Sequence, residues 1–341
     1  MLQLRTEAIL KSIVEQYIAR ATPVPSQSIT NNYELAVSAA TIRNEMAHLE
    51  QEGYITRYHP SAGSVPSDKG YRYYVESLDK VALPLAEQRL VIHLLHQVEQ
   101  DIEEWLSLAA TLMAQLAQNV AVATIPKPVK CKFKHLELVS LRDLLALVVL
   151  VFHGARVRQQ LITFDQAISQ AQLTVIANKL STTYSDLTNQ QILAKDTKLS
   201  PIEQQVTNYL LKMMQTEDEQ QYEEPYVDGL HFILNQPEFA RNQQGLNLME
   251  LVEHRNLLMT IVPHGLASQQ VQVIIGNENK AAAIHNYSVV ISQYGLPEEA
   301  VGTICIVGPT RMAYARTISI LEYLSTVLSG MVAELYGRKS A

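Results

Sequence analysis

Cysteine is scarce in this sequence. Only Cys131 and Cys305 occur among the 341 residues, and they lie far apart along the chain. Two such distant thiols form no disulfide framework and have no metal-ligand spacing. The sequence is therefore typical of a protein that works in a reducing cytoplasm.

Long apolar runs are also missing. The richest stretch, Leu144–Phe152, has nine residues, whereas a membrane-spanning helix needs about 18 or more. The length of this stretch suits a buried strand. Charged residues such as Arg5, Glu7 and Lys11 interrupt the first predicted helix, so we expect no signal peptide there. We expect no contact with a membrane.

Catalytic and metal-binding signatures are absent. No G-x-S-x-G, H-E-x-x-H, G-x-G-x-x-G or Walker sequence occurs, and the ten histidines are scattered. His93 and His96 could share a helix face, but they have no neighbouring cysteine or carboxylate ligands, so a solvated pair is the favoured interpretation. We predict no enzyme activity, no cofactor and no metal site.

The first 37 residues predict two helices. Apolar residues at helical spacing indicate a helix over residues 5–20, which Pro23 ends. Ser26 is a suitable N-cap for a second, short helix that reaches Tyr33.

A third helix begins after Ser38, whose hydroxyl can cap the free backbone N–H groups of the first turn. One face of this helix is apolar, and Gly53 supplies a left-handed stop. The apolar positions are Ala39, Ile42, Met46 and Leu49. The opposite face and its flanks carry Ala40, Thr41, Arg43, Asn44, Ala47, His48 and Gln51. Such a face suits DNA reading, because Asn and Arg match base edges and Ala permits close approach; the alternative is an ordinary solvated helix face.

The residues that follow predict a short hairpin and a closing helix. Residues 54–57 are β-prone, residues 59–64 have turn chemistry, and Val65 begins a return strand. Ser67 then caps a helix that carries Tyr71 and Tyr74 on its apolar face. Three helices and a hairpin predict a winged helix-turn-helix over residues 1–80. The predicted DNA contacts are Ser38, Ala40, Thr41, Arg43, Asn44, Ala47 and His48 of the helix, and Arg57, Ser61, Gly63, Ser64, Lys69 and Arg72 of the wing.

An excess of positive charge is missing, which argues against generic nucleic-acid binding. The net charge is −7, and residues 1–80 hold eight Lys and Arg against nine Asp and Glu, a balance of −1. Arg43, Arg57, Lys69 and Arg72 nevertheless cluster around the predicted helix and wing, so the local field can be positive. We expect modest affinity per subunit and therefore a dimer.

After Leu83-Pro84, the pattern predicts a linking helix over residues 84–124. Apolar residues in it alternate spacings of three and four, as in a coiled coil. These are Leu95, Val98, Ile102, Trp105, Ala109, Leu112 and Leu116. Two interpretations stay open: a dimer-forming helix, and a helix packed on its own domain.

The rest of the chain predicts a sensor-like α/β domain interrupted by another domain. Strands are expected at 135–140, 144–152 and 157–164, and again at 270–275, 287–293 and 303–307, with a helix at 246–258 and a final helix at 311–335. Between the two sets of strands, helices are expected at 168–180 and 201–214. The predicted fold class is a multidomain α+β protein. Residues 125–165 and 246–341 would form the sensor-like domain, and residues 166–245 would form an insert.

Several segments resemble one known family. Residues 38–46 read SAATIRNEM, 49–50 read LE, 61–63 read SAG, and 70–72 read GYR; farther along, NQPEF at 235–239, IIGNEN at 274–279 and GPTRMAYAR at 308–316 follow. These resemble the landmarks of the HrcA heat-inducible transcription repressors over nearly the whole chain. Two positions depart from that pattern: Ser64 stands where the family usually has arginine, and Pro25 where glycine is common.

The resemblance implies a winged helix, a GAF-like domain and an inserted dimerising domain. It also implies a dimer that binds an inverted repeat upstream of chaperonin and Hsp70 genes, with folding assisted by the GroEL chaperonin. The insert, with Ile233-Leu234 and NQPEF, is the first candidate for the dimer interface, and the heptads at 95–116 are the second. The alternative function is a winged-helix regulator whose GAF-like domain senses a small molecule.

Overall fold

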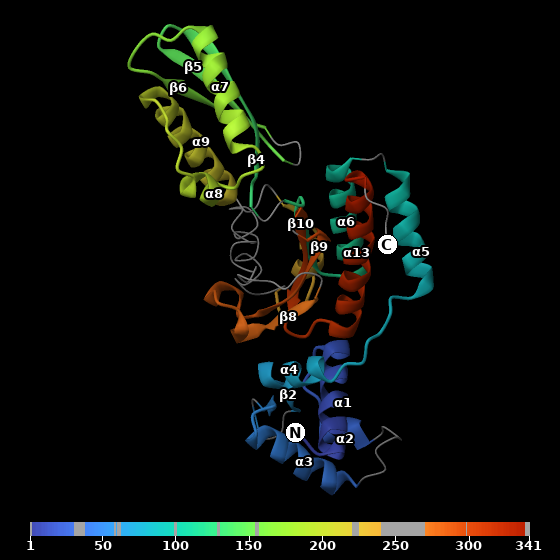
Figure 1. Cartoon of the computed structure of the whole chain (residues 1–341). Helices are drawn as coiled ribbons and strands as arrows, with labels where there is room; N and C mark the ends of the chain where they lie inside the picture. Colours follow the sequence, from blue (N-terminus) through green and yellow to red (C-terminus); the bar gives the residue numbers. More distant parts are fainter. Residues whose placement is uncertain are drawn as a thin grey trace. The chain divides into compact units, whose positions relative to one another are not determined.

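The computed structural model describes residues 2–30, 38–57, 59, 63–98, 101–127, 130–153, 157–219, 225–239, 270–297 and 299–337. The chain is a mixed α+β protein that divides into two compact units (Figure 1). The main unit comprises residues 1–125, 224–295 and 302–341, and the insert unit comprises residues 126–223 and 296–301.

The main unit begins with a small N-terminal module of helices and a hairpin. Its elements are α1 (Leu4–Arg20), α2 (Ser26–Thr30), α3 (Ala39–Gln51), β1 (Ile55–Thr56), β2 (Val65–Pro66) and α4 (Asp68–Glu76). Two of the predicted caps are confirmed: Ser38 accepts from the Thr41 N–H and Ser67 from the Gly70 N–H, each at 3.2 Å. Ser26, predicted as the cap of α2, is instead the first residue of that helix. Gly53 adopts the predicted left-handed conformation, with φ of +78°. Local sequence signals thus fix where these helices begin and end.

An apolar stripe holds α3 in place. Ile42, Met46 and Leu49 are buried, as predicted, and α3 packs against α1 and α2. The hairpin is antiparallel, with Ile55 opposite Pro66 and Thr56 opposite Val65. Because the stripe points inward, the opposite face of α3 must point outward.

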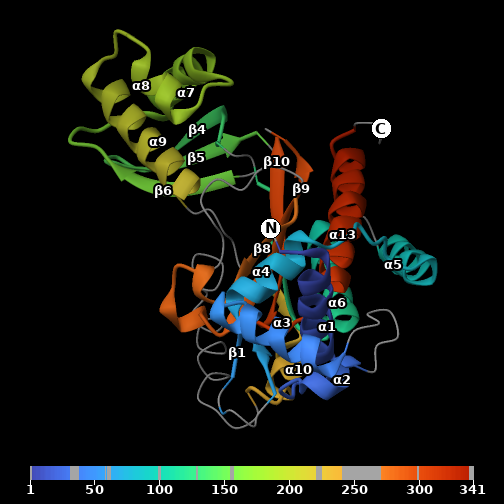
Figure 2. The same cartoon turned by 90° about the horizontal axis from the view of Figure 1, so that it is seen from below.

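The rest of the main unit is a five-stranded sheet with helices. The strand order is β7 (Tyr226–Asp228), β3 (Val120–Ala123), β10 (Ala300–Pro309), β9 (Tyr287–Leu296) and β8 (Gln272–Ile275). The helices are α5 (Leu85–Gln97), α6 (Ile102–Ala117), α10 (Leu230–Leu234) and α13 (Tyr314–Leu335), with 3₁₀ turns η1 (Gly276–Glu278) and η2 (Ala282–Ile284). Figures 1 and 2 both show α6 and α13 side by side, and these helices pack on each other. The three predicted strands after residue 270 are confirmed.

By length and composition alone, α13 could cross a membrane, with a mean hydropathy of 1.4. Core helices of globular proteins share this composition. Ile320, Leu321 and Leu324 of α13 are fully buried. The packing of these residues accounts for the apolar character of the helix.

The predicted linking helix over residues 84–124 is wrong. Val98 is extended after α5, and α6 begins after Asp101, whose carboxylate accepts from the Glu103 N–H at 2.8 Å. Residues 120–123 form strand β3 instead of a helix end. Trp105, Ala109 and Leu112 are buried within the main unit, where α6 packs on β3 and β7. The heptad pattern therefore reflects a helix packed on its own unit.

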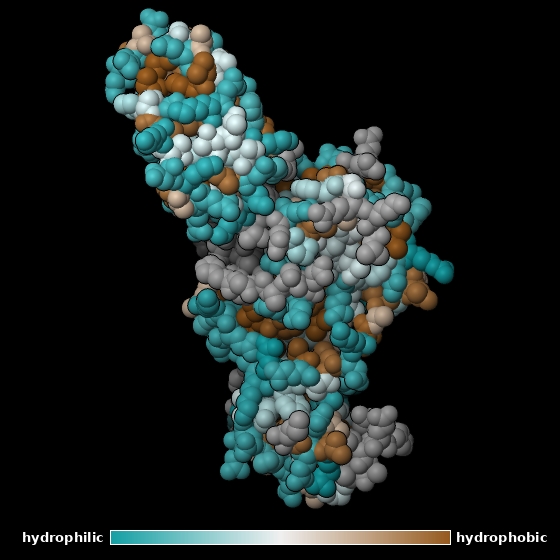
Figure 3. All heavy atoms as spheres, viewed as in Figure 1, coloured by the Kyte–Doolittle hydropathy of each residue, from teal (hydrophilic) through white to brown (hydrophobic). Residues whose placement is uncertain are grey.

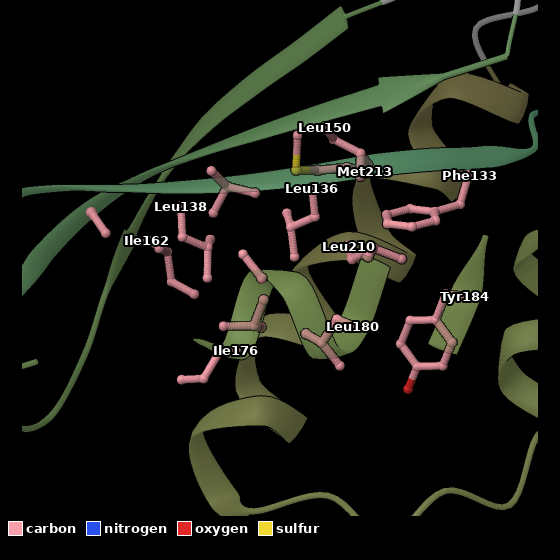
Figure 4. Packing of buried hydrophobic residues seen from close by; sticks show 14 of the residues in the cluster. Phe133, Leu136, Leu138, Leu150, Ile162, Ile176, Leu180, Tyr184, Leu210 and Met213 are labelled. Atoms are coloured by element: carbon pink, nitrogen blue, oxygen red, sulfur yellow. The ribbon is translucent and has the colours of Figure 1, made fainter. Parts of the chain in front are cut away.

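The insert unit has its own sheet, which corrects the assignment of residues 125–165 to the sensor-like domain. The three-stranded antiparallel sheet consists of β4 (Phe133–Arg142), β5 (Leu145–Phe152) and β6 (Val157–Thr163). It is joined by α7 (Gln170–Tyr184), α8 (Asn189–Ala194) and α9 (Pro201–Glu219). Figure 4 shows strand residues such as Leu138 and Leu150 facing Leu180 of α7 and Leu210 of α9. The meander was predicted correctly, but its packing partners are these helices.

Residues 230–239 belong to the main unit, not to the insert. Ile233 is buried, and the Phe239 ring stacks on Tyr287 of β9 with 4.9 Å between ring centres. Ile233 and Phe239 are therefore core residues and unavailable for the predicted dimer interface, whereas Leu234 is exposed. The helix predicted at 246–258 lies outside the described residues.

Buried and half-buried side chains alternate along β5, so two leucines of this strand give a matched test of the packing of the insert unit. Leu150 is buried in its core, whereas Leu147 points to the other face and is half-buried. Leu150→Ala should lower the free energy of unfolding by about 2–5 kcal/mol, since it leaves a cavity. Measured at a protein concentration at which the chain is monomeric, Leu147→Ala should cost about 1 kcal/mol or less. Urea unfolding followed by circular dichroism measures both, and equal losses would contradict the assigned faces.

Candidate nucleic-acid interface

The outward face of α3 carries the predicted reading residues. Ala40, Arg43, Asn44, Ala47 and His48 are all exposed, as the periodicity predicted. Thr41 is half-buried, and its hydroxyl lies 2.9 Å from that of Ser38 at the helix start. The face therefore presents a cation, an amide and an imidazole between two small residues.

Glu45 anchors this helix to α1. Its carboxylate accepts from the Thr6 hydroxyl at 2.7 Å and from the Arg5 guanidinium at 2.6 and 3.0 Å. The hydrogen bond from Thr6, followed by that from Arg5, lowers the pKa of Glu45. The sequence analysis missed this residue, because its partners lie about 40 positions away and leave no local signal.

Two cations lie around the hairpin. Arg57 contacts Glu50 at 3.3 Å and donates to the Ser64 hydroxyl at 3.3 Å. Lys69 is exposed; its Nζ donates to the Glu52 carbonyl at 2.7 Å and lies 4.2 Å from the centre of the Tyr54 ring. Both cations are held beside the end of α3.

Arg72 is engaged elsewhere, which corrects its predicted role as a phosphate contact. Its guanidinium forms an ion pair with Glu278 and donates to the Val273 carbonyl at 2.6 Å. The hydrogen bond with Glu278 raises the pKa of Arg72. Both partners come from the strand β8 region, 201 and 206 positions away along the chain.

Ser64 is also misplaced in the prediction. It is fully buried, and its backbone exchanges hydrogen bonds with Val24 at 2.8 and 2.9 Å. Gly63 packs so closely on Pro23 and Val24 that an added Cβ would lie about 2.5 Å from their backbone. These two residues join the hairpin to the α1–α2 connection. Ser61 lies outside the described residues.

The described residues hold no cluster of three or more His, Cys, Asp and Glu side chains that could bind a metal. Cys131 and Cys305 are buried free thiols, and burial raises the pKa of both. His93 and His96 each contact their own helix α5, through Gln97 and the Ile92 carbonyl. The chemistry available here is recognition by hydrogen bonds and charge.

Comparison with known proteins agrees with this arrangement. Residues 103–318 match the family described as the HrcA protein C-terminal domain. A heat-inducible transcription repressor HrcA from Dehalococcoides mccartyi is 52% identical over 338 residues, covering 99% of this chain and 98% of the relative. One from Roseiflexus castenholzii is 40% identical and covers 98% and 95%. The chain belongs to the HrcA family.

A solved structure described as a hypothetical protein shares the fold of this HrcA-family chain. The TM-score is 0.58 at 22% identity, and the match covers 98% of this chain and 99% of the other. The arrangement of elements is thus one that another chain also adopts. The family places this protein among repressors of heat-shock transcription.

The Glu45 anchor predicts a pH dependence in this HrcA-family chain. Because its folded pKa lies below the ordinary value of 4.5, its charge stabilises the module above that pH, and the contribution is lost as pH falls through the folded pKa. Glu45→Gln should therefore lower the melting temperature at pH 7, and its difference from wild type should shrink below pH 4.5.

Thermal melts from pH 7 downward, with Glu52→Gln at the exposed end of α3 as control, measure this difference. A deficit that persists unchanged at the lowest pH would show that the charge of Glu45 is not the stabilising feature.

Proposed function

We propose that this chain represses transcription by binding an inverted-repeat operator as a dimer, with α3 as its reading helix in a winged helix-turn-helix. The observation that carries the proposal is the exposed face of α3, where Arg43 and Asn44 project from a helix whose other face is buried. Figure 3 shows mostly hydrophilic residues on the visible surface of this module. We assign the five-stranded sheet and its helices as the GAF-like domain.

Base reading is assigned to Asn44 and Arg43. Asn pairs with the N6 and N7 edge of adenine, and Arg pairs with O6 and N7 of guanine, in the major groove. Ala40 and Ala47 leave room on either side of these side chains for the helix to approach the groove wall. Ser38, Thr41 and His48 lie on the same exposed side and are assigned to backbone or base-edge contacts.

Phosphate contact is assigned to Lys69 and Arg57. Their charged groups lie beside the end of α3, held by the Glu52 carbonyl and by Glu50. Gly63 brings the hairpin close to the module, and Ser64 and Arg72 are left out for the reasons given above. With few available cations, each half-site should bind weakly, so two modules must act together.

Dimerisation is assigned to the outer face of the insert-unit sheet, which we call the outer sheet face: Val139, Leu147, Val151, Val157 and Leu161. In the strand register, Leu147 of β5 lies between Val139 of β4 and Leu161 of β6, and Val151 lies opposite Val157. Exposed apolar residues include Val139, Val157 and Leu161, at 42, 56 and 53%. In Figure 3, hydrophobic residues gather at the end of this unit where β5 and β6 lie. Exposed apolar residues gathered on one sheet face are typical of an interface.

We further propose that the target operons encode the chaperonin and Hsp70, and that GroEL assists the folding of the repressor in the cytoplasm. The family name of the relatives, heat-inducible transcription repressor, supports heat-shock control. When unfolded protein occupies the chaperonin, less repressor reaches its active fold and the operons open.

The reading assignment is tested by Arg43→Ala and Asn44→Ala. Each should weaken binding to the inverted repeat by about 1–3 kcal/mol, because a base-edge contact is lost, with much smaller loss on random DNA. Melting temperature should barely change, since both side chains are exposed. Fluorescence anisotropy with operator and scrambled duplexes measures the two affinities.

Arg20→Ala, at an exposed arginine at the end of α1, is the control and should bind operator nearly as wild type does. Equal losses on operator and scrambled DNA would reassign Arg43 or Asn44 to the phosphate backbone.

The dimer assignment is tested by Val139→Lys. A charge on the outer sheet face should convert the dimer to a monomer and lower operator affinity at least 10-fold. Val175→Lys, the same change at a 67% exposed position on α7, should leave the dimer intact. Light scattering gives the mass of each variant, and a dimeric Val139→Lys protein would move the interface elsewhere.

A further inference from the structure

Helix α4 ties the N-terminal module to the five-stranded sheet within the main unit. The Asp68 carboxylate accepts two hydrogen bonds from Asn277, one from its backbone N–H and one from its side-chain amide, both at 2.9 Å. The preceding residue, Gly276, has a φ of +50°, and an added Cβ would lie within 2.5 Å of the Asp68 carboxylate. Only glycine allows the two segments to approach this closely.

One helical turn later, Arg72 makes the second contact. Its Nε donates to Glu278 at 2.8 Å, its Nη2 pairs with the other carboxylate oxygen, and Nη2 also donates to the Val273 carbonyl at 2.6 Å. The Glu278 carboxylate is fixed in position, because it also accepts a hydrogen bond from the Ile275 N–H at 2.9 Å. A bidentate arginine–carboxylate pair fixes direction as well as distance.

A third contact involves the end of α1. Arg311 pairs with Glu238, donates to the Gln236 side chain at 3.0 Å, and donates to the Ile18 carbonyl at 3.3 Å. The side chain of Arg311 is only 15% exposed. Between the clusters, the buried rings of Tyr71 and Tyr314 meet with 5.9 Å between centres.

Together, Asp68, Arg72, Asn277, Glu278 and Arg311 form what we call the α4 latch. None of its contacts uses a residue of α3, and α4 lies between β8 and α3 in Figure 1. The latch therefore leaves the reading face uncovered. The covalent connection from the module to α5, residues 77–84, contains no helix or strand. A rigid link between the two parts has to come from the latch.

We propose that the α4 latch sets the separation and direction of the two reading helices in the repressor dimer, and so selects the half-site spacing of the operator. This inference rests on the proposed function. A module on a loose tether can reach half-sites at many separations, but each dimer then loses orientational freedom on binding. A latched module moves together with the rest of its main unit, so the freedom of the tether is already removed before binding. Affinity at the correct spacing and discrimination against other spacings both increase.

The test uses the full-length chain with Arg72→Met and Arg311→Met combined. Lys11→Met is the matched control, since Lys11 lies in the same module, pairs with Glu7 at 2.9 Å and is 34% exposed, against 29% for Arg72. The DNA is an inverted repeat selected from a random pool by the wild-type protein. A series then lengthens or shortens its spacer by about one to five base pairs, up to half a helical turn.

The wild type and Lys11→Met should lose affinity steeply away from the selected spacing. The latch variant should lose about 10-fold at that spacing and vary by only about 3-fold across the series, while its affinity for a single half-site stays unchanged. A second variant keeps Arg311 and exchanges the charges of the other pair, Arg72→Glu with Glu278→Arg. It should retain part of the spacing preference that the latch variant loses. Circular dichroism confirms that each variant is folded.

A spacing profile identical to that of the wild type would overturn the proposal. Higher affinity at every spacing would also overturn it, because the contacts would then restrain the module from DNA. If the wild type selects no inverted repeat, the proposed function fails, and the latch is tested by a measurement on the protein alone. A dye on Gln51→Cys should report fast module tumbling by anisotropy decay only in the latch variant; its absence would refute a latch.

Discussion

Burial of one face of α3 is the constraint on which the recognition surface depends. Ile42, Met46 and Leu49 are removed from water against the other helices of the module, and each such side chain contributes about 1.5–3 kcal/mol. With that face fixed, helical geometry leaves no freedom in which residues point outward. The hydrogen bonds from Thr6 and Arg5 to Glu45 fix the orientation of α3 on α1, in addition to the apolar contacts. The outward face of α3, which we propose as the reading face, is thus specified by residues buried on the opposite side of the helix.

Several cations of the main unit are already engaged in ion pairs. Glu45 pairs with Arg5, Glu7 with Lys11 and Glu278 with Arg72. These pairs hold elements together, but they neutralise charge that phosphates could otherwise attract. A module built in this way gains little non-specific affinity from its charge. Specific binding then depends on a few base contacts and on joining two modules, which makes their relative placement important.

Local features were predictable and distant ones were not. The caps Ser38 and Ser67 and the stop at Gly53 follow from chemistry within a few residues, and all are present. The break at Val98 was missed because heptad spacing continues through it, although the Asp101 cap marks it. Alternation in β4–β6 says which faces are apolar but not which helices cover them, so the strands were joined to the wrong sheet. Arg72 and Ser64 were misplaced because their partners lie elsewhere in the chain.

Under the proposed function, the outer sheet face links assembly of the dimer to the folding of the chain. An uncovered apolar sheet face such as that around Val139 and Leu161 has the character of surfaces that associate or aggregate. Two encounters can cover it in turn: a chaperonin, which binds the chain while it folds, and then a second subunit, which yields the active dimer. Because a half-site alone is bound weakly, the monomer contributes little repression. Unfolded protein that occupies the chaperonin therefore lowers the number of chains that reach the dimer, and with it the amount of repressor on DNA. The same apolar residues that build the dimer would make the chain sensitive to unfolded protein.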